Sequence, residues 1–306
     1  MLMDSHPPRV IGPVPNAEKL GEWSLVLRSQ EIRHGVTSRP EGYYVTVEGR
    51  DADRSVEVLR AYEEENKDFR PRVRVPRERL PFGQSLTAPL IAAAMVLFFA
   101  VTGPVALRSG WFVAGTADSQ RILHGEAWRA ITALTLHADT AHVLGNALAG
   151  TVFLSFLFRR LGAGRGTFLV LLAGALANVA NAAFHAAMHV PHRSIGASTA
   201  VFATVGVLAA TQLMINRAAG VRRWTDRVGP VVGGFALLGM LGSSAQSDLG
   251  AHLLGFVVGA VLGVIVLAPK KAREPLGRGK QWLLGSLSLA LVIAAWAAAA
   301  VRSPLW

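Results

Sequence analysis

Four polar side chains lie in, or at the start of, stretches of the sequence that are otherwise apolar. Ser198 follows two small residues at the start of one stretch, and His252 lies near the start of another. A serine hydroxyl becomes an effective nucleophile when a base removes its proton, and the pKa of imidazole suits that task. Ser198 and His252 are therefore candidates for the nucleophile and the general base of an acyl-transfer reaction.

The other two polar residues, His142 and Asn146, are four positions apart, which places them on one face of a helix. Acyl transfer needs hydrogen-bond donors for the oxyanion that forms on the substrate. These two side chains, with the backbone N–H of Ser198 at a helix start, are candidates for that role. No Asp or Glu falls inside an apolar stretch, and Asp248 lies in the loop before His252, so the sequence predicts a dyad rather than a triad.

Each of these residues also has a purely structural interpretation. A serine in a Gly- and Ala-rich helix usually only packs, and an intramembrane histidine can serve as a structural hydrogen-bonding group. Gly255 and Gly259 follow His252 at four-residue spacing, which is typical of closely packed helices and would hold His252 near its neighbour. The expected depth of these residues favours the chemical interpretation, because His142, Ser198 and His252 should all lie toward the outer side of the membrane.

The elements that carry these residues are expected to be membrane-spanning helices. Hydrophobic residues make up 51% of the 306, charged residues only 17%, and the mean hydropathy is +0.37, which is unusual for a soluble domain. A helix needs about 20 apolar residues to cross a bilayer. Seven stretches approach that length: 87–107, 140–158, 166–188, 198–215, 229–245, 249–268 and 281–301.

The basic residues predict how these helices are oriented. Between residues 87 and 306, 12 Lys and Arg lie in the loops of one side and 5 in those of the other. The positive-inside rule then places the N-terminus in the cytoplasm and Trp306 outside, and we expect a bacterial inner (plasma) membrane. The same loop clusters account for the net charge of +11, so we expect no nucleic-acid partner. The absence of cysteine excludes disulfides and thiolate chemistry.

Residues 1–82 are expected to form a small cytoplasmic α+β module that ends in a basic linker. The Pro-rich start has no apolar core, so it does not resemble a signal peptide. Residues 23–27 and 43–47 alternate as short strands do, and residues 51–67 show the pattern of an amphipathic helix. The linker at 70–79 contains five arginines.

Several segments, taken in order, resemble the rhomboid intramembrane proteases. They are Trp128-Arg129, His137-Ala-Asp-Thr-Ala-His142-Val-Leu-Gly-Asn146, Gly196-Ala-Ser198 and Ala251-His252-Leu-Leu-Gly255-Phe-Val-Val-Gly259. The resemblance runs from about residue 87 to 268. It implies an all-α polytopic membrane protein with a six-helix rhomboid-like core at 83–270. Residues 271–306 would then form a cytoplasmic loop and a seventh, C-terminal transmembrane helix.

The resemblance also implies roles for individual residues. Ser198 would be the nucleophile and His252 the general base, while His142, Asn146 and the Ser198 amide would form the oxyanion hole. Gly196, Gly255 and Gly259 would support these motifs. The substrates would be single-span transmembrane proteins in the lipid bilayer, cut near the outer face, and no metal or other cofactor is implied. Many active members have Gly after the serine, where this chain has Thr199.

Three other interpretations compete with proteolysis. A catalytically inactive rhomboid-like protein that binds transmembrane clients would share the packing features, although this chain has both Ser and His. A small transporter could use His142 and His252 to line a polar path, but the internal repeats typical of transporters are absent from the sequence. A Zn²⁺ site at His185, His189 and His192 has suitable spacing but no evident carboxylate or Cys ligand nearby, so an exposed loop is favoured. No His-Glu-x-x-His motif supports a metalloprotease.

Overall fold

The computed structural model describes residues 7–67, 86–218, 248–269 and 276–303, with 225, 228–229, 232–234, 236 and 274 between them. The chain divides into two compact units, Met1–Val75 and Pro76–Trp306. Each unit contains its own cluster of buried apolar side chains.

The N-terminal unit is a three-stranded antiparallel sheet with two helices. Its elements are β1 (Arg9–Val14), α1 (Ala17–Ser29), β2 (His34–Arg39), β3 (Gly42–Val47) and α2 (Ala52–Glu65). The strand order is β1-β3-β2, and Val45 of the central strand lies opposite Ile11 and Val36. Leu27, Val45 and Leu59 meet in the core. A small α/β region at the N-terminus is thus confirmed, as are the strand at 43–47 and the helix at 51–67.

The strand expected at residues 23–27 is wrong, because these residues belong to helix α1. Asn16 caps this helix by accepting a hydrogen bond of 2.8 Å from the N–H of Lys19. Leu20, Trp23 and Leu27 form a helical stripe that packs on the core, whereas Leu25 is 70% exposed. Apolar alternation over five residues fits this stripe as well as it fits a strand.

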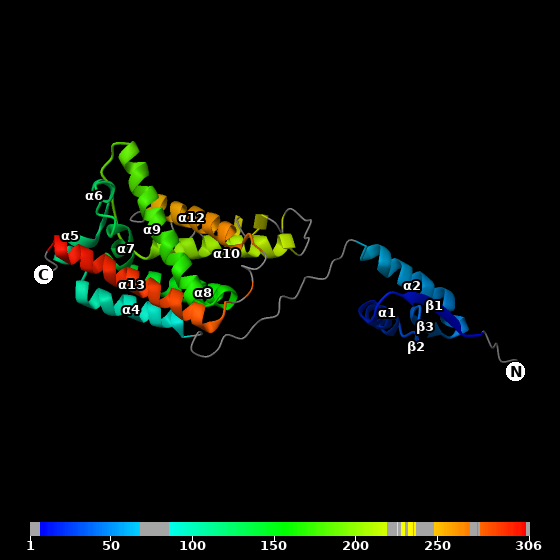
Figure 1. The fold of residues 1–306 in the computed structure, drawn as a ribbon. Coiled ribbons are helices and arrows are strands. Elements are labelled where there is room, and N and C mark those ends of the chain that lie inside the picture. The colour runs from blue at the N-terminus through cyan, green and yellow to red at the C-terminus, as the bar shows by residue number, and fades with distance from the viewer. Residues whose placement is uncertain are drawn as a thin grey trace. The chain divides into compact units, whose positions relative to one another are not determined.

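Among the described residues, six helices are long and apolar enough to cross a membrane (Figure 1). They are α4 (Thr87–Thr102), α8 (Thr140–Leu161), α9 (Ala163–Ala187), α10 (Ser198–Ala218), α12 (Leu249–Leu267) and α13 (Arg278–Arg302). Six of the seven expected stretches are thereby confirmed as helices. The remaining stretch, 229–245, lies outside the described residues except at 229, 232–234 and 236.

Helix α10 is the most enclosed of the six. Two thirds of its span (67%) is buried, compared with 11% for α4 and 17% for α13. It lies beside α12 (Figure 1), and the two backbones approach closely through glycines. A Cβ atom at Gly255 would overlap the carbonyl oxygen of Thr199, and one at Gly259 would overlap that of Ala203. The close packing expected from the glycine spacing is therefore present.

The last helix, α13, is docked on the bundle by polar contacts at one end and aromatic contacts at the other. Gln281 accepts a hydrogen bond of 2.9 Å from the N–H of Arg165 and donates one of 2.8 Å to the carbonyl of Leu161. Trp296 packs with Trp111 and Phe98, at ring-centroid distances of 5.1 and 5.4 Å. The helix is thus joined to the α8–α9 turn and to the loop that follows α4.

That first loop, between α4 and α8, contains short elements of its own. They are η2 (Val105–Leu107), α5 (Gly110–Gly115), β4 (Ala117–Asp118), α6 (Ser119–Leu123), α7 (Arg129–Thr132) and η3 (Ala133–Thr135). Strand β4 pairs with β5 (Arg193–Ser194), which precedes α10. The loop is therefore linked directly to the segment that leads into Ser198.

Candidate active site

Ser198 is the first residue of α10 and is half-buried. The turn before it depends on Gly196, whose φ of +124° is in a region that favours glycine. The Gly196 N–H donates to the Ala133 carbonyl at 2.9 Å, and the Ala197 N–H donates to Nε2 of His137 at 3.4 Å. The serine therefore begins its helix from a turn held by the first loop.

His252 lies in the first turn of α12 and is 5% exposed. Its ring packs against Phe202, with centroids 4.6 Å apart and planes inclined by 33°. Phe202 follows Ser198 by four residues, so both side chains belong to one face of α10, about 6 Å apart along its axis. The histidine is thus packed against the helix face that begins with the serine.

His142 and Asn146 belong to α8, and His142 lies beside the Gly196 turn. A Cβ at Gly196 would lie 2.6 Å from Nε2 of His142 and 3.5 Å from Oγ of Ser198, so these two atoms lie within about 6 Å of each other. Nδ1 of His142 accepts the N–H of Ala138 at 3.4 Å, which leaves Nε2 to carry the hydrogen of a neutral ring. His142 therefore presents a donor on the side of the serine turn.

Asn146 is 8% exposed and lines a cavity of about 990 Å³ in the membrane unit. Ala197, Thr135 and Trp296 line the same cavity. In the part of the chain that the structure describes, the Nδ2 atom of Asn146 has no hydrogen-bond partner. A buried amide donor without a partner is unusual, and it is suited to binding an anionic oxygen of a ligand.

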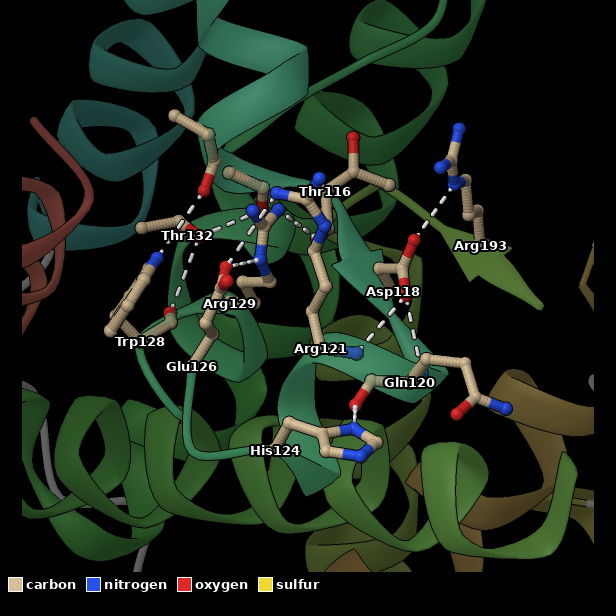
Figure 2. A network of polar contacts seen from close by, with 12 residues as sticks. Thr116, Asp118, Gln120, Arg121, His124, Glu126, Trp128, Arg129, Thr132 and Arg193 are labelled. Carbon is tan, nitrogen blue, oxygen red and sulfur yellow. Dashed lines mark hydrogen bonds and ion pairs between the residues drawn. The ribbon is translucent and has the colours of Figure 1, made fainter. Parts of the chain in front are cut away.

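The segment before Ser198 is fixed to the first loop by a short ladder and an ion pair (Figure 2). Ala117 pairs with Ser194 and Asp118 with Arg193, and Arg193 Nε lies 2.9 Å from the Asp118 carboxylate. Asp118 also accepts the N–H groups of Gln120 and Arg121, both at 3.1 Å. These contacts restrict the backbone segment that precedes Gly196 and Ser198.

The Trp128-Arg129 pair belongs to the same network. Arg129 is 1% exposed, and its Nε donates to Glu126 at 2.6 Å while Nη1 donates to the carbonyl of Thr116 at 3.0 Å (Figure 2). Trp128 Nε1 donates to the carbonyl of Ala114 at 3.3 Å. The buried guanidinium thus holds the first loop together from inside.

His137 is fully buried beside the turn that contains Gly196 and Ala197. Burial, with a smaller effect of the neighbouring His142, lowers its pKa from 6.5 to about 4. The ring is therefore neutral near pH 7, and its Nε2 can accept the Ala197 N–H. These contacts give His137 a structural role at the turn before Ser198.

A second polar cluster lies just before α12. Asp248 caps this helix by accepting the Ala251 N–H at 2.9 Å, and its other oxygen accepts from His192 at 2.7 Å and Asn181 at 3.1 Å. Burial alone would raise the pKa of Asp248, but the Ala251 N–H and His192 bring it below its usual value. His192 also stacks on His185, with ring centroids 3.8 Å apart.

This cluster corrects one expectation from the sequence. The histidines at 185–192 do have a carboxylate beside them, because Asp248 reaches His192 from 56 residues away. Within the described ranges, no group of three or more His, Cys, Asp or Glu could hold a metal ion. The arrangement acts instead as a cap that fixes the start of the helix carrying His252.

Comparison with known proteins finds a matching family and two distant relatives. Residues 124–269 match the Rhomboid domain. The chain is 28% identical over 211 residues, 68% of its length, to the rhomboid protease GluP of Bacillus subtilis, although the match covers only 39% of that protein. It is also 28% identical over 183 residues to the rhomboid-type protein YdcA of the same organism, covering 60% of this chain and 88% of YdcA. This chain is a multi-pass membrane protein with a rhomboid domain and distant homology to these relatives.

Proposed function

We propose, from the rhomboid domain that this chain carries at residues 124–269, that it is an intramembrane serine protease with a Ser198–His252 dyad. Two contacts carry the proposal. The His252 ring packs on the face of α10 that begins with Ser198, and Nε2 of His142 faces the same serine turn from α8.

In the proposed mechanism, His252 removes the proton from Ser198 Oγ as that oxygen attacks the scissile carbonyl carbon. The C–O bond that forms places a negative charge on the former carbonyl oxygen. His252 then donates the same proton to the leaving amine as the C–N bond breaks, which leaves an acyl-serine. A water molecule, deprotonated by His252, hydrolyses this ester and restores the hydroxyl.

The oxyanion would be bound by Nε2–H of His142, by the amide of Asn146 and by the backbone N–H of Ser198. Two features support these assignments. Nδ1 of His142 is occupied as an acceptor, so the hydrogen is on the nitrogen that faces the serine turn. The Asn146 donor is buried and unpartnered among the described residues, so a ligand oxygen would satisfy it.

The proposed substrates are single-span transmembrane proteins, cut near the outer face of the membrane. The cleavage position near the outer face rests on Ser198 and His252, which lie at the starts of α10 and α12, together with the orientation that the basic loops predict. Reporter fusions at residues 220 and 275 should be cytoplasmic and one at residue 119 external. The reverse result would place the dyad at the inner face.

The decisive experiment is hydrolysis of a fluorogenic transmembrane substrate by the purified protein in detergent or liposomes. Wild type should cleave it, and Ser198→Ala should not. A fluorophosphonate probe should label Ser198 in wild type and fail to label His252→Ala, because an unassisted hydroxyl is a weak nucleophile. Labelling that survives His252→Ala would rule out the dyad.

A second candidate function is the binding of transmembrane clients without cleavage. Thr199 is the observation that favours it, because a β-branched residue replaces the glycine expected after the nucleophile. Folded wild-type protein that retains a transmembrane substrate but neither cleaves it nor reacts with the probe would support this function over proteolysis.

A further inference from the structure

A second pocket, of about 580 Å³, lies between the first loop and the segment that precedes Ser198. Four arginines line it: Arg108, Arg121, Arg129 and Arg193. Asp118 is the one carboxylate among the residues that line it. Figure 2 shows Arg121, Arg129 and Asp118 of the first loop together with Arg193 of β5. A pocket with this composition has a strong excess of positive charge.

The ion pairs around the pocket do not neutralise that excess. Asp118 pairs with Arg193 at 2.9 Å, and Glu126 pairs with Arg129 at 2.6 Å and is 3.9 Å from Arg121. Two carboxylates thus face four guanidinium groups. Within the described ranges, no carboxylate lies within ion-pair distance of Arg108, so Arg108 and Arg121 supply the surplus charge.

The pocket is also bordered by apolar side chains that are exposed. Val113 and Val105 line it and are 57% and 43% exposed, and the neighbouring Leu107 is 69% exposed. In a loop that follows a membrane-spanning helix, exposed Val and Leu are suited to contact acyl chains. The pocket therefore combines a site for an anion with a surface for hydrocarbon.

We propose that this pocket binds the phosphodiester headgroup of an anionic phospholipid, with Arg108 and Arg121 as its principal ligands and Val105, Leu107 and Val113 against the acyl chains. Guanidinium groups bind phosphate oxygens through paired hydrogen bonds, which suits a pocket lined by several arginines. A headgroup anchored in the bilayer satisfies both the charge and the exposed apolar surface, whereas a soluble anion satisfies only the charge.

Binding at this place would act on the proposed active site. Arg193, Ser194 and Ile195 line the pocket and lead directly into Gly196. A headgroup between them and the first loop would hold the turn that positions Ser198. This second step rests on the proposed function, whereas lipid binding itself does not, and the experiment separates the two.

Binding is measured first, on Ser198→Ala protein, so that it does not depend on catalysis. Native mass spectrometry from detergent with added phosphatidylglycerol should show a retained lipid. The double substitution Arg108→Gln, Arg121→Gln should lower that retention about tenfold. The matched control, Arg159→Gln with Arg217→Gln, removes two exposed charges in the last turns of α8 and α10 and should stay within about twofold of the parent.

Three outcomes would overturn lipid binding. They are equal retention by the pocket variant and the control, equal retention of phosphatidylcholine and phosphatidylglycerol, and displacement of the lipid by millimolar inorganic phosphate, which would indicate a soluble-anion site. Thermal unfolding of the pocket variant should match that of the parent without added lipid. If it does not, Arg108→Lys with Arg121→Lys, which keeps both charges but not the paired hydrogen bonds, should retain more lipid than the glutamine variant, and an equal loss would also count against the site.

Activity is measured second, on proteins that retain Ser198. Cleavage in liposomes should rise when phosphatidylglycerol is added to phosphatidylcholine, and the pocket variant should lose this response. Retained lipid without any change in cleavage would overturn the regulatory step and leave the lipid site standing. Absence of cleavage in all liposomes would contradict the proposed protease function but not the lipid site.

Discussion

The indole Nε1 of Trp296 donates a hydrogen bond of 3.1 Å to Oγ1 of Thr135. This joins the last helix of the chain to the residue that lies two positions before His137. Gly115 accommodates the same indole, since a Cβ there would lie 2.5 Å from the ring. The C-terminal helix α13 is therefore in contact with the loop that supports the candidate active site.

Trp296→Phe should destabilise the protein by about 1 kcal/mol, because it removes this hydrogen bond and keeps most of the aromatic packing. Trp282→Phe is the matched control, since Trp282 lies on the same helix but is 77% exposed, and it should change stability by less than about 0.5 kcal/mol. The free energy of unfolding in detergent checks both. Equal effects would show that the Thr135 contact contributes nothing.

Asn146→Ala should lower kcat by about 10²–10³ and leave KM nearly unchanged, because an oxyanion donor acts mainly in the transition state. Ala147→Gly, at the adjacent buried position on the same helix, controls for a general effect of loosening α8. Full turnover in a well-folded Asn146→Ala protein would reassign Asn146 to helix packing.

Thr199→Gly tests the residue that departs from the rhomboid pattern. Thr199 is 2% exposed, and its carbonyl lies against Gly255 of α12, so its backbone takes part in helix packing. We expect kcat to change by less than about tenfold, or about 1.4 kcal/mol of barrier, with about 1 kcal/mol of stability lost to the glycine. A gain of several hundredfold would mean that Thr199 obstructs the oxyanion hole.

His137 should make the folded state sensitive to moderate acid. Its pKa falls from 6.5 to about 4 on folding, so between these values the unfolded chain binds more protons. The free energy of unfolding should therefore decline as the pH falls from 6.5 toward 4, by up to about 3 kcal/mol. Above pH 6.5, His137 should add no further pH dependence. Unfolding measured across this range should show a shallower dependence in His137→Gln. His124→Gln, at an exposed histidine of the first loop, is the matched histidine-to-glutamine control.

Asp248→Ala should act on His252 through the start of α12. Loss of the cap should cost about 1–2 kcal/mol, and kcat should fall because the first turn that carries His252 is no longer fixed. Asp248→Asn can still cap the helix and should recover most of the stability, which separates the cap from the contact with His192. Unchanged kcat in Asp248→Ala would mean that helix packing alone positions His252.

Much of the membrane unit could be predicted from the sequence, because apolar runs of about 20 residues have few alternatives to a spanning helix. The four-residue spacings of His142 with Asn146 and of Gly255 with Gly259 likewise describe one helix face each. Local pattern was less informative in the N-terminal unit. The strand expected at residues 23–27 is helical, and β2 has mostly exposed side chains, so it lacks the apolar alternation that reveals a strand.

The contacts that assemble the candidate site could not be predicted in the same way. Asp248 reaches His192, and the Gly196 turn meets His142, only after distant helices have packed. The internal structure of the first loop could not be predicted either. Its strand β4 depends on a partner, β5, that lies about 75 residues later in the chain, and no local pattern reports such a pairing.

Gln281 has a consequence for how the chain is assembled during synthesis. The turn between α8 and α9 leaves the Leu161 carbonyl and the Arg165 N–H to be satisfied by a side chain that follows 120 and 116 residues later. Unsatisfied backbone groups are costly in a nonpolar environment. The second and third helices can therefore insert as a hairpin, but that hairpin reaches its final form only when the ribosome has delivered α13. The turn between α8 and α9 is therefore completed by a side chain that is synthesised more than 100 residues later.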